Sequence, residues 1–249
     1  MLKEIVNKKI QIAVSEEKVV LPQEIQEKIE EHWEKVISQT PDLWNGEIMC
    51  VSKYHETENE IQIICKKSNY AHYLYDERIG LPLQYACSSM VAGCLLETSD
   101  GYYVVGELAP NTSYPFCMQI SGGNADKQDI EDGKMNILKT IQREVREEVN
   151  IDINDTKQVE QYQIKYMELP EGNRHVYMVF AKGKLLMTAE QMKEYYKEYL
   201  EYLKKNQLEI EFGKLHFIKK ENGEEELKKL KNPKREYLEK LLQEDSMNG

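Results

Sequence analysis

The sequence predicts one α/β domain with additions at both ends. Its 249 residues are enough to bury a large core, and 41% of them are hydrophobic. Segments with the alternation of strands are interleaved with segments of helical period, and no repeat or clean linker divides them. We therefore predict a main domain over residues 42–220. A strand and a helix precede it in 1–41, and a charged helical tail follows in 221–249.

The first half of the chain predicts a helix and several strands. A short strand, KKIQIAV, leads into a helix over about 22–38, where apolar residues recur at helical spacing. Two strand-like runs follow, EIMCVSKYH and EIQIICKK. After a mixed segment, VAGCLLETSDGYYVVGEL predicts a hairpin with Asp100 and Gly101 in its turn.

The second half predicts two helices and three extended segments. A polar loop over 121–134 leads into a helix over 135–149. VEQYQIKYMEL and HVYMVFAKGKL are predicted strands joined through PEGNR. A helix over 189–204 begins with a capping box of Thr188 and Gln191. LEIEFGKLHFI is the last extended segment, and the tail beyond it is weakly helical.

Composition excludes several classes of function. The chain has 33 Lys and Arg against 44 Asp and Glu, a formal net charge of −11. This balance disfavours binding to nucleic acid or to an anionic membrane, because phosphate binding depends on clustered cations. No apolar run approaches the roughly 20 residues that span a bilayer, and the N-terminus lacks a signal-peptide core.

The five cysteines indicate a reducing compartment. Their number is odd, they form no C-x-x-C pair, and most lie in apolar runs such as VAGCLL. Buried reduced thiols are therefore expected, and with them a cytoplasmic protein. The histidines share no ligand spacing, so no zinc site is predicted.

The segment REVREEVNI, residues 143–151, concentrates carboxylates on one helix face. Glu144, Glu147 and Glu148 fall within about 100° of arc, beside an apolar stripe that would pack on a sheet. Arg143 lies one turn before Glu147 and can hold its carboxylate in place. The like charges repel one another and oppose the helix dipole. A hard cation such as Mg²⁺ reverses the sign of this interaction, because it takes oxygen ligands.

A solvated acidic face is the alternative interpretation, since EKIEEHWEK and EEELKKLK carry similar pairs. The preceding residues favour the metal. Gly122 and Gly123 follow an apolar segment and open the loop that runs into the helix. Glycine lets the backbone approach a ligand closely.

At these residues the sequence resembles the Nudix hydrolases. Their signature is a glycine-led loop and a helix that ends in R-E-U-x-E-E-x-G-U, where U is apolar. The resemblance implies a Nudix fold, a mixed β-sheet sandwiched between helices, with N- and C-terminal helical additions in this chain. It also implies that Glu144, Glu147 and Glu148 bind Mg²⁺ or Mn²⁺ and that Arg143 orients them.

Three features depart from the family pattern. The earlier box glutamate falls at Met135, which cannot bind a hard metal. The loop before the helix is longer than in the family, so Asp129, Glu131 or Asp132 is a possible substitute. The box glycine is Asn150, which tolerates a left-handed conformation best after glycine.

The resemblance extends over residues 42–218 to one divergent branch of the family, which contains a UDP-glucose diphosphatase. The motifs that carry it are LWNGEIMCVSKY, KKSNYAHYLY, the box ending EVNI and MTAEQMKEYYKEY. It implies a UDP-sugar as substrate, with UDP-glucose cleaved to UMP and glucose 1-phosphate. Gly122, Gly123, Asn69, Tyr70 and Arg174 are then expected to contact it. For Asn69 and Tyr70 an ordinary surface loop remains the alternative.

The expected mechanism is substitution at phosphorus by an activated water. Glu147 is the predicted base, with Glu168 or Glu171 as alternatives, and Arg174 and His175 as phosphate contacts. A strand-connecting turn is the alternative interpretation of this last segment. The tyrosine-rich helix over 189–204 is interpreted as a packing face.

Two rival functions stay open. One is an ADP-ribose or dinucleotide diphosphatase on the same scaffold, and the other is a non-catalytic nucleotide-binding regulatory module. The predicted partner is in every case a small nucleoside diphosphate derivative, with no nucleic acid and no membrane. A homodimer is one candidate assembly, and the sequence does not determine the oligomeric state.

Overall fold

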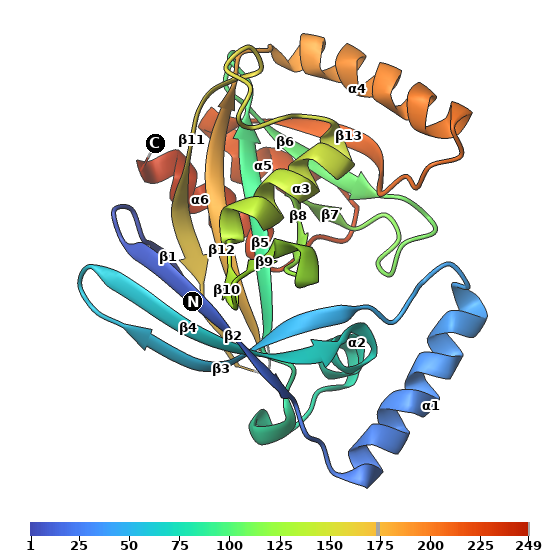
Figure 1. Ribbon diagram of the computed structural model, residues 1–249. Helices are drawn as coiled ribbons and strands as arrows, with labels where there is room; N and C mark the ends of the chain where they lie inside the picture. Colours follow the sequence, from blue (N-terminus) through green and yellow to red (C-terminus); the bar gives the residue numbers. More distant parts are fainter. Residues whose placement is uncertain (173–174, 249) are drawn as a thin grey trace.

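The structure is a computed structural model and describes residues 1–172 and 175–248 (Figure 1). The helices of this part are α1 (Gln23–Gln39), α2 (Tyr70–Ile79), α3 (Ile137–Val149), α4 (Ala189–Lys205), α5 (Gly223–Lys229) and α6 (Tyr237–Asn248). The strands are β1 (Leu2–Glu4), β2 (Lys9–Lys18), β3 (Glu47–Glu56), β4 (Glu60–Asn69), β5 (Ser89–Glu97), β6 (Tyr102–Leu108), β7 (Met118–Gln119), β8 (Ser121–Asn124), β9 (Ile130–Glu131), β10 (Lys134–Met135), β11 (Val159–Glu168), β12 (Val176–Leu185) and β13 (Phe212–Lys219).

The strands form one mixed sheet. Its main path runs β1-β11-β12-β5-β3-β4-β2-β10-β9, with β8 and β6 also paired to β5, and β13 and β7 paired to β6. The pairs β12–β5 and β2–β4 are parallel, and the other pairs are antiparallel. Helices pack on both sides of this sheet (Figure 1). The predicted α/β class, a mixed sheet held between helices, is confirmed.

The two faces of β12 belong to two different cores. Val179 shares a cluster of buried residues with Ile141 of α3. The next residue, Phe180, shares the second cluster with Leu238 of α6. Neighbouring residues of a strand point to opposite faces, so β12 separates α3 from α6. In Figure 1, α3 crosses one side of β5 and β12, and the C-terminal helices lie behind them.

Segments from both ends of the chain enter these cores. β1 pairs with β11 and β2 pairs with β4, so residues before 42 contribute strands to the sheet. The tail was expected to be weakly helical. Instead, α6 buries Leu238, Leu241 and Leu242 completely. The domain boundaries at 41/42 and 220/221 stay predictions.

Local details support some of the element predictions and correct others. Thr188 and Gln191 form the predicted capping box at the start of α4. Gly101 adopts φ +83° in the turn between β5 and β6, as a hairpin turn requires. The mixed segment contains a helix, α2, that the sequence analysis missed. The predicted helix over 135–149 begins at 137, because Met135 belongs to β10.

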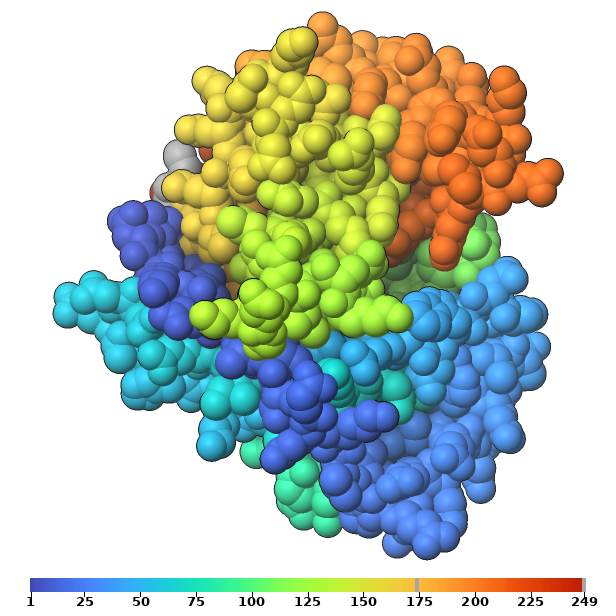
Figure 2. Space-filling view, viewed as in Figure 1, coloured from blue at the N-terminus to red at the C-terminus, as the bar shows by residue number. Residues whose placement is uncertain are grey.

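All five cysteines are buried, as their apolar surroundings predicted. No helix in the described part of the chain combines the length and the apolar character that a membrane crossing demands. Figure 2 shows the segment around α3 lying between the N-terminal segments on one side and the segment of α4 on the other.

Candidate metal centre

The helix that carries the predicted site has defined ends. The side chain of Asn136 accepts a hydrogen bond from the backbone N–H of Leu138 at the start of α3. Asn150 follows the last residue with φ 57° and ψ 30°, the left-handed conformation that closes many helices. The predicted role of Asn150 in place of glycine is confirmed.

Two carboxylates of α3 meet a third from a distant segment. Glu144 and Glu148 lie one turn apart and are 7% and 2% exposed. Glu211 lies between α4 and β13. One oxygen of each lies within 4.8 Å of the others. Two of the three predicted carboxylates of α3 thus converge with a third, Glu211, which sequence analysis missed. A glutamate alternating with apolar residues in LEIEF was the available signal.

The carboxylate of Glu148 is only half satisfied. Its Oε2 accepts a hydrogen bond of 2.8 Å from the backbone N–H of Gly122. Its Oε1 is buried and has no hydrogen-bond partner among the described residues, and the same holds for Oδ1 of Asn124 close by in β8. A buried acceptor without a donor costs free energy. A cation, or a donor from outside the chain, would satisfy it.

The glycines of the SGG segment allow β8 to lie close to the carboxylate of Glu144 and to β5. A Cβ on Gly123 would lie 2.6 Å from Oε1 of Glu144. A Cβ on Gly122, whose φ is +156°, would lie 2.4 Å from the carbonyl oxygen of Ala92 in β5. Gly123 therefore makes room for the carboxylate of α3, and Gly122 makes room for the neighbouring strand.

Arg143 is held by an acidic partner outside its own helix. Its Nη2 lies 3.1 Å from Oδ2 of Asp129, a carboxylate that is 2% exposed and also accepts from the hydroxyl of Thr140. Its Nη1 donates to Oε1 of Glu144 at 2.7 Å. Asp129 thus fixes the guanidinium, and the guanidinium orients Glu144.

The structure explains the departure at Met135. This residue is 5% exposed and belongs to the apolar core, with Ile12 of β2 as its partner in the sheet. Of the three acidic residues in the long loop, Asp129 enters the site, as the partner of Arg143. Glu131 forms an ion pair with Lys139 outside the cluster.

Glu147 stands at the edge of the cluster. Its side chain is 59% exposed, and its Oε2 lies 3.4 Å from Nη1 of Arg143. It is not one of the three converging carboxylates. Its backbone carbonyl accepts a hydrogen bond from the hydroxyl of Tyr199 on α4. The roles predicted for Glu147 in metal binding and in catalysis stay predictions.

Tyr195 and Tyr196 of α4 pack, as the sequence predicted, whereas Tyr202 is exposed. The hydroxyl of Tyr195 donates to the carbonyl of Asn150 at 2.8 Å, and that of Tyr196 donates to the carbonyl of Phe212 at 2.5 Å. These bonds attach α4 to the end of α3 and to the start of β13. They thereby position the segment that carries Glu211.

Burial perturbs the protonation of the three carboxylates. It raises the pKa of Glu144 to about 8, against the opposing effect of Arg143, and the charges of Glu211 and Glu147 add to the rise. Burial also raises the pKa of Glu211 to about 7 and the pKa of Glu148 well above its usual value. A cation bound here would displace these protons.

A cavity of about 220 Å³ opens beside the carboxylates. Gly122, Gly123 and Asn124 line it together with Glu211 and the predicted contact Tyr70. The hydroxyl of Tyr70 bonds to the hydroxyl of Ser113 across the cavity wall. Three of the predicted contacts thus border the same space as one carboxylate of the centre.

Other predicted residues lie elsewhere. Asn69 caps α2 by accepting from the backbone N–H of His72, and it lines a different cavity. Arg174 lies outside the described residues. Nδ1 of His175 lies 3.1 Å from Oδ2 of Asp76.

The two alternative bases differ in their exposure to solvent. Glu168 is buried at the end of β11, where it pairs with Leu2 of β1 in the sheet. Glu171 is exposed and forms an ion pair with Lys240 of α6. Neither belongs to the converging carboxylates.

Comparisons with known proteins add partial likenesses. No family model matches the sequence, and no curated protein does. A solved structure of a Deinococcus radiodurans protein is 13% identical with a TM-score of 0.43, over 63% of this chain and 82% of that one. A Nudix hydrolase from Nitrosomonas europaea is 15% identical with a TM-score of 0.39, over 65% and 89%. A MutT protein from Methanosarcina mazei is 12% identical with a TM-score of 0.41, over 64% and 94%. Likenesses of this size do not assign an activity.

Proposed function

We propose that the protein is a metal-dependent hydrolase of the Nudix type. It cleaves the diphosphate of a nucleoside diphosphate that is linked to another group. The proposed substrate is a UDP-sugar, with UDP-glucose cleaved to UMP and glucose 1-phosphate.

The unpaired oxygen of Glu148 carries this proposal. It is buried beside the carboxylates of Glu144 and Glu211, and when all three are ionised it has no hydrogen-bond donor among the described residues. Leaving such a group unpaired costs about 1–3 kcal/mol, and more when it is charged. Mg²⁺ and Mn²⁺ take oxygen ligands, so the donor set fits either ion.

The bound ion would supply charge neutralisation for the diphosphate and an acidified water. The residues of the chain divide the remaining tasks. Glu144, Glu148 and Glu211 would hold the ion, with Glu147 as a further ligand or as the base that takes the proton of the attacking water. Arg143, fixed by Asp129, keeps the carboxylate of Glu144 in place.

The cavity beside the carboxylates supports a substrate with an aromatic or hydroxylated part. Gly122 and Gly123 bring backbone to its wall, and Tyr70 contributes a ring and a hydroxyl. We retain Asn69 and Arg174 as proposed contacts. The five buried thiols support a cytoplasmic location, since reducing compartments preserve such groups.

A non-catalytic nucleotide-binding module is the second candidate. The burial of Met135 in the apolar core favours it, because the position of the family's earlier glutamate contributes nothing to the site. An ADP-ribose or dinucleotide diphosphatase differs from the first proposal only in substrate, and the same experiment separates them.

The test is product formation from UDP-glucose, other UDP-sugars, ADP-ribose and diadenosine polyphosphates, with Mg²⁺ or Mn²⁺. The wild type is compared with Glu147→Gln and Glu148→Gln, each checked for folding by circular dichroism. Metal-dependent cleavage that Glu148→Gln abolishes supports the hydrolase. Binding of a member of the panel without turnover supports the module instead.

A further inference from the structure

Two cysteines and a histidine form a second buried cluster, outside the carboxylate centre. Cys50 lies in β3, His72 in the first turn of α2, and Cys87 just before β5. One ligand atom of each residue lies within 4.8 Å of the others, and all three residues are at most 3% exposed. The two thiols are in contact, with 2.7 Å between their sulfur atoms. The fold thus brings two sulfur atoms and one ring nitrogen together.

Hydrogen bonds turn one ring nitrogen of His72 toward the thiols. Its Nε2 lies 2.8 Å from the carbonyl oxygen of Tyr85, which can only accept, so Nε2 carries a proton. In the neutral ring, Nδ1 then has the lone pair. The hydroxyl of Ser68 lies 2.8 Å from Nδ1 and also bonds to the thiol of Cys87. A histidine that donates one N–H to a carbonyl and offers its other nitrogen is prepared to bind a metal.

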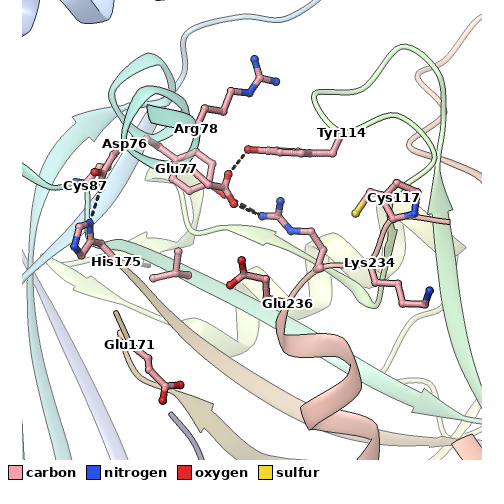
Figure 3. Close-up of a pocket in the computed structure, with 14 residues that line it drawn as sticks. Asp76, Glu77, Arg78, Cys87, Tyr114, Cys117, Glu171, His175, Lys234 and Glu236 are labelled. Carbon is pink, nitrogen blue, oxygen red and sulfur yellow. Dashed lines mark hydrogen bonds and ion pairs between the residues drawn. The ribbon is translucent and has the colours of Figure 1, made fainter. Parts of the chain in front are cut away.

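Cys87 is held in place through its backbone. Its N–H donates to Oδ2 of Asp76 at 2.8 Å. The same carboxylate accepts from the backbone N–H of Leu81 at 2.8 Å and lies 3.1 Å from Nδ1 of His175. Figure 3 shows Cys87, Asp76 and His175 together at one side of a cavity of about 510 Å³. Asp76 therefore fixes Cys87, and the cavity provides room for water beside it.

The donor set selects zinc over the hard ions. Thiolate sulfur and imidazole nitrogen are typical ligands of Zn²⁺, whereas Mg²⁺ and Mn²⁺ prefer oxygen. Two thiolates, a neutral imidazole and Zn²⁺ add up to zero charge, so the buried complex would carry no net charge. Two sulfur atoms on one tetrahedral zinc ion are about 3.8 Å apart. The thiols therefore need to separate by about 1 Å, which small side-chain rotations achieve.

A disulfide is the alternative for two thiols in contact. All five cysteines are free, and a disulfide between Cys50 and Cys87 needs an oxidant that a reducing compartment does not supply. A disulfide would also give no role to the lone pair of His72. The nitrogen beside the two sulfur atoms therefore favours a metal.

The sequence analysis predicted no zinc site, because it considered the spacing of ligands along the chain. Zinc ligands in small motifs usually come in closely spaced pairs. The three residues of this cluster come from a strand, a helix and a loop, so only the packing of these elements reveals the cluster.

We propose that Cys50, His72 and Cys87 bind one Zn²⁺ ion, with water in the fourth position. The ion joins β3 to α2 and to the segment before β5. The helix α2 carries Tyr70 and Tyr73, which line the cavity beside the carboxylates. The zinc ion thus stabilises one wall of that cavity. This inference goes beyond the proposed function and does not depend on the carboxylate centre.

Titration of the reduced, metal-stripped protein with Co²⁺, a spectroscopic substitute for Zn²⁺, tests the site. Sulfur-to-cobalt charge transfer absorbs only where a thiolate binds the ion, so binding to carboxylates is not counted. Excess Mg²⁺ and a Glu148→Gln background keep Co²⁺ from the carboxylate centre. The ligand variants are Cys50→Ala, Cys87→Ala and His72→Gln, of which the last keeps an N–H donor. The matched control is Cys94→Ala, because Cys94 is also buried but lies outside the cluster.

The expected result is saturable charge-transfer absorption in the parent and the control, which Zn²⁺ abolishes by displacing Co²⁺. Each ligand variant, checked for folding by circular dichroism, should bind Co²⁺ at least about 100-fold more weakly. Zn²⁺ should raise the melting temperature of the parent and the control more than that of Cys87→Ala.

Three outcomes would overturn the zinc site. They are a folded parent without charge-transfer absorption, equal absorption in the parent and the ligand variants, and a disulfide between Cys50 and Cys87 that forms under the same reducing conditions. The first and third are measured on the parent, so a variant that fails to fold does not protect the proposal.

The zinc site and the hydrolase can fail separately. Thiolate-bound cobalt in the Glu148→Gln background would support the zinc site even if the wild type cleaves no diphosphate. Metal-dependent cleavage by a wild type that binds no cobalt through thiolates would keep the hydrolase and refute the zinc site.

Discussion

Replacing Gly123 with alanine would place a methyl group against the carboxylate of Glu144. The new Cβ would lie 2.6 Å from Oε1, 2.8 Å from Cδ and 2.9 Å from Oε2 of that side chain. These atoms form the far end of a flexible side chain, so the carboxylate can retreat while the backbone stays. Gly122→Ala differs, because its Cβ would meet backbone atoms of Ala92 and Gly93 at 2.4 and 2.5 Å.

The size of the effect follows from the distance. Ordinary contact needs about 3.4 Å or more, so the carboxylate of Glu144 must withdraw by roughly 0.8 Å. A misplacement of about 1 Å at a catalytic group costs about 100-fold in rate. We therefore expect Gly123→Ala to lose about 100-fold in kcat/KM. Its free energy of unfolding should fall by only about 1–3 kcal/mol, the usual cost of overpacking.

The measurements are kcat/KM at saturating Mg²⁺, the Mg²⁺ concentration at half-maximal rate, and urea denaturation. The matched control is Gly213→Ala, where the nearest atom to a new Cβ is 3.7 Å away. A Gly123→Ala protein that is folded and retains the wild-type metal dependence and rate would refute the assignment of Glu144 to the metal centre.

Three further predictions concern metal binding, the core and pH. Glu148→Gln should raise the melting temperature of the metal-free protein and weaken Mg²⁺ binding at least about 100-fold, as thermal denaturation with and without Mg²⁺ would show. Asp245→Ala should lower the free energy of unfolding by about 3–5 kcal/mol in urea, because this buried carboxylate pairs with lysine side chains of the sheet. Hydrogen bonds from Lys3 and Lys8 lower the pKa of Glu56 to about 2, so its stabilising effect should be complete above about 4.5 and lost as the pH falls through about 2. The partly exposed ion pairs of Glu56 with Lys3 and Lys8 should contribute about 1 kcal/mol to the free energy of unfolding. The melting temperatures of wild type and Glu56→Gln should therefore converge at low pH.

The sequence predicted which carboxylates of the candidate site lie close together within one helix, although their function stays a prediction. Glu144 and Glu148 are four residues apart, and that spacing alone places them side by side. Glu147 belongs to the same arc of the helix, but it is about 100° away from Glu148 around the helix axis. In the structure its side chain points toward solvent. Glu211 could not be predicted, because it reaches the site only through the packing of α4 and β13.

The same distinction holds for the fold. Strands with regular alternation and helices with a clear apolar face were predicted near their true bounds. α2 was not, because its stability depends on individual polar contacts such as the cap by Asn69 and the bonds of Asp76 to the following loop. The burial of α6 was not predicted, because its many charged residues resemble those of a solvent-exposed helix. Its buried Asp245 is matched by Lys165 and Lys182 from distant strands, which no local pattern reveals.

The pairing of β1 with β11 has a consequence for the order of assembly. It joins residues 2–4 to residues 166–168, and α6 then covers the same region from still farther along the chain. Contacts between such distant segments close large loops. The chain loses conformational entropy on closing the loop before the new contacts stabilise it, and this slows folding. During synthesis, β2, β3 and β4 can associate early, whereas β1 must wait for most of the chain. Nascent chains should therefore depend on chaperones longer than the length of the main domain alone would suggest.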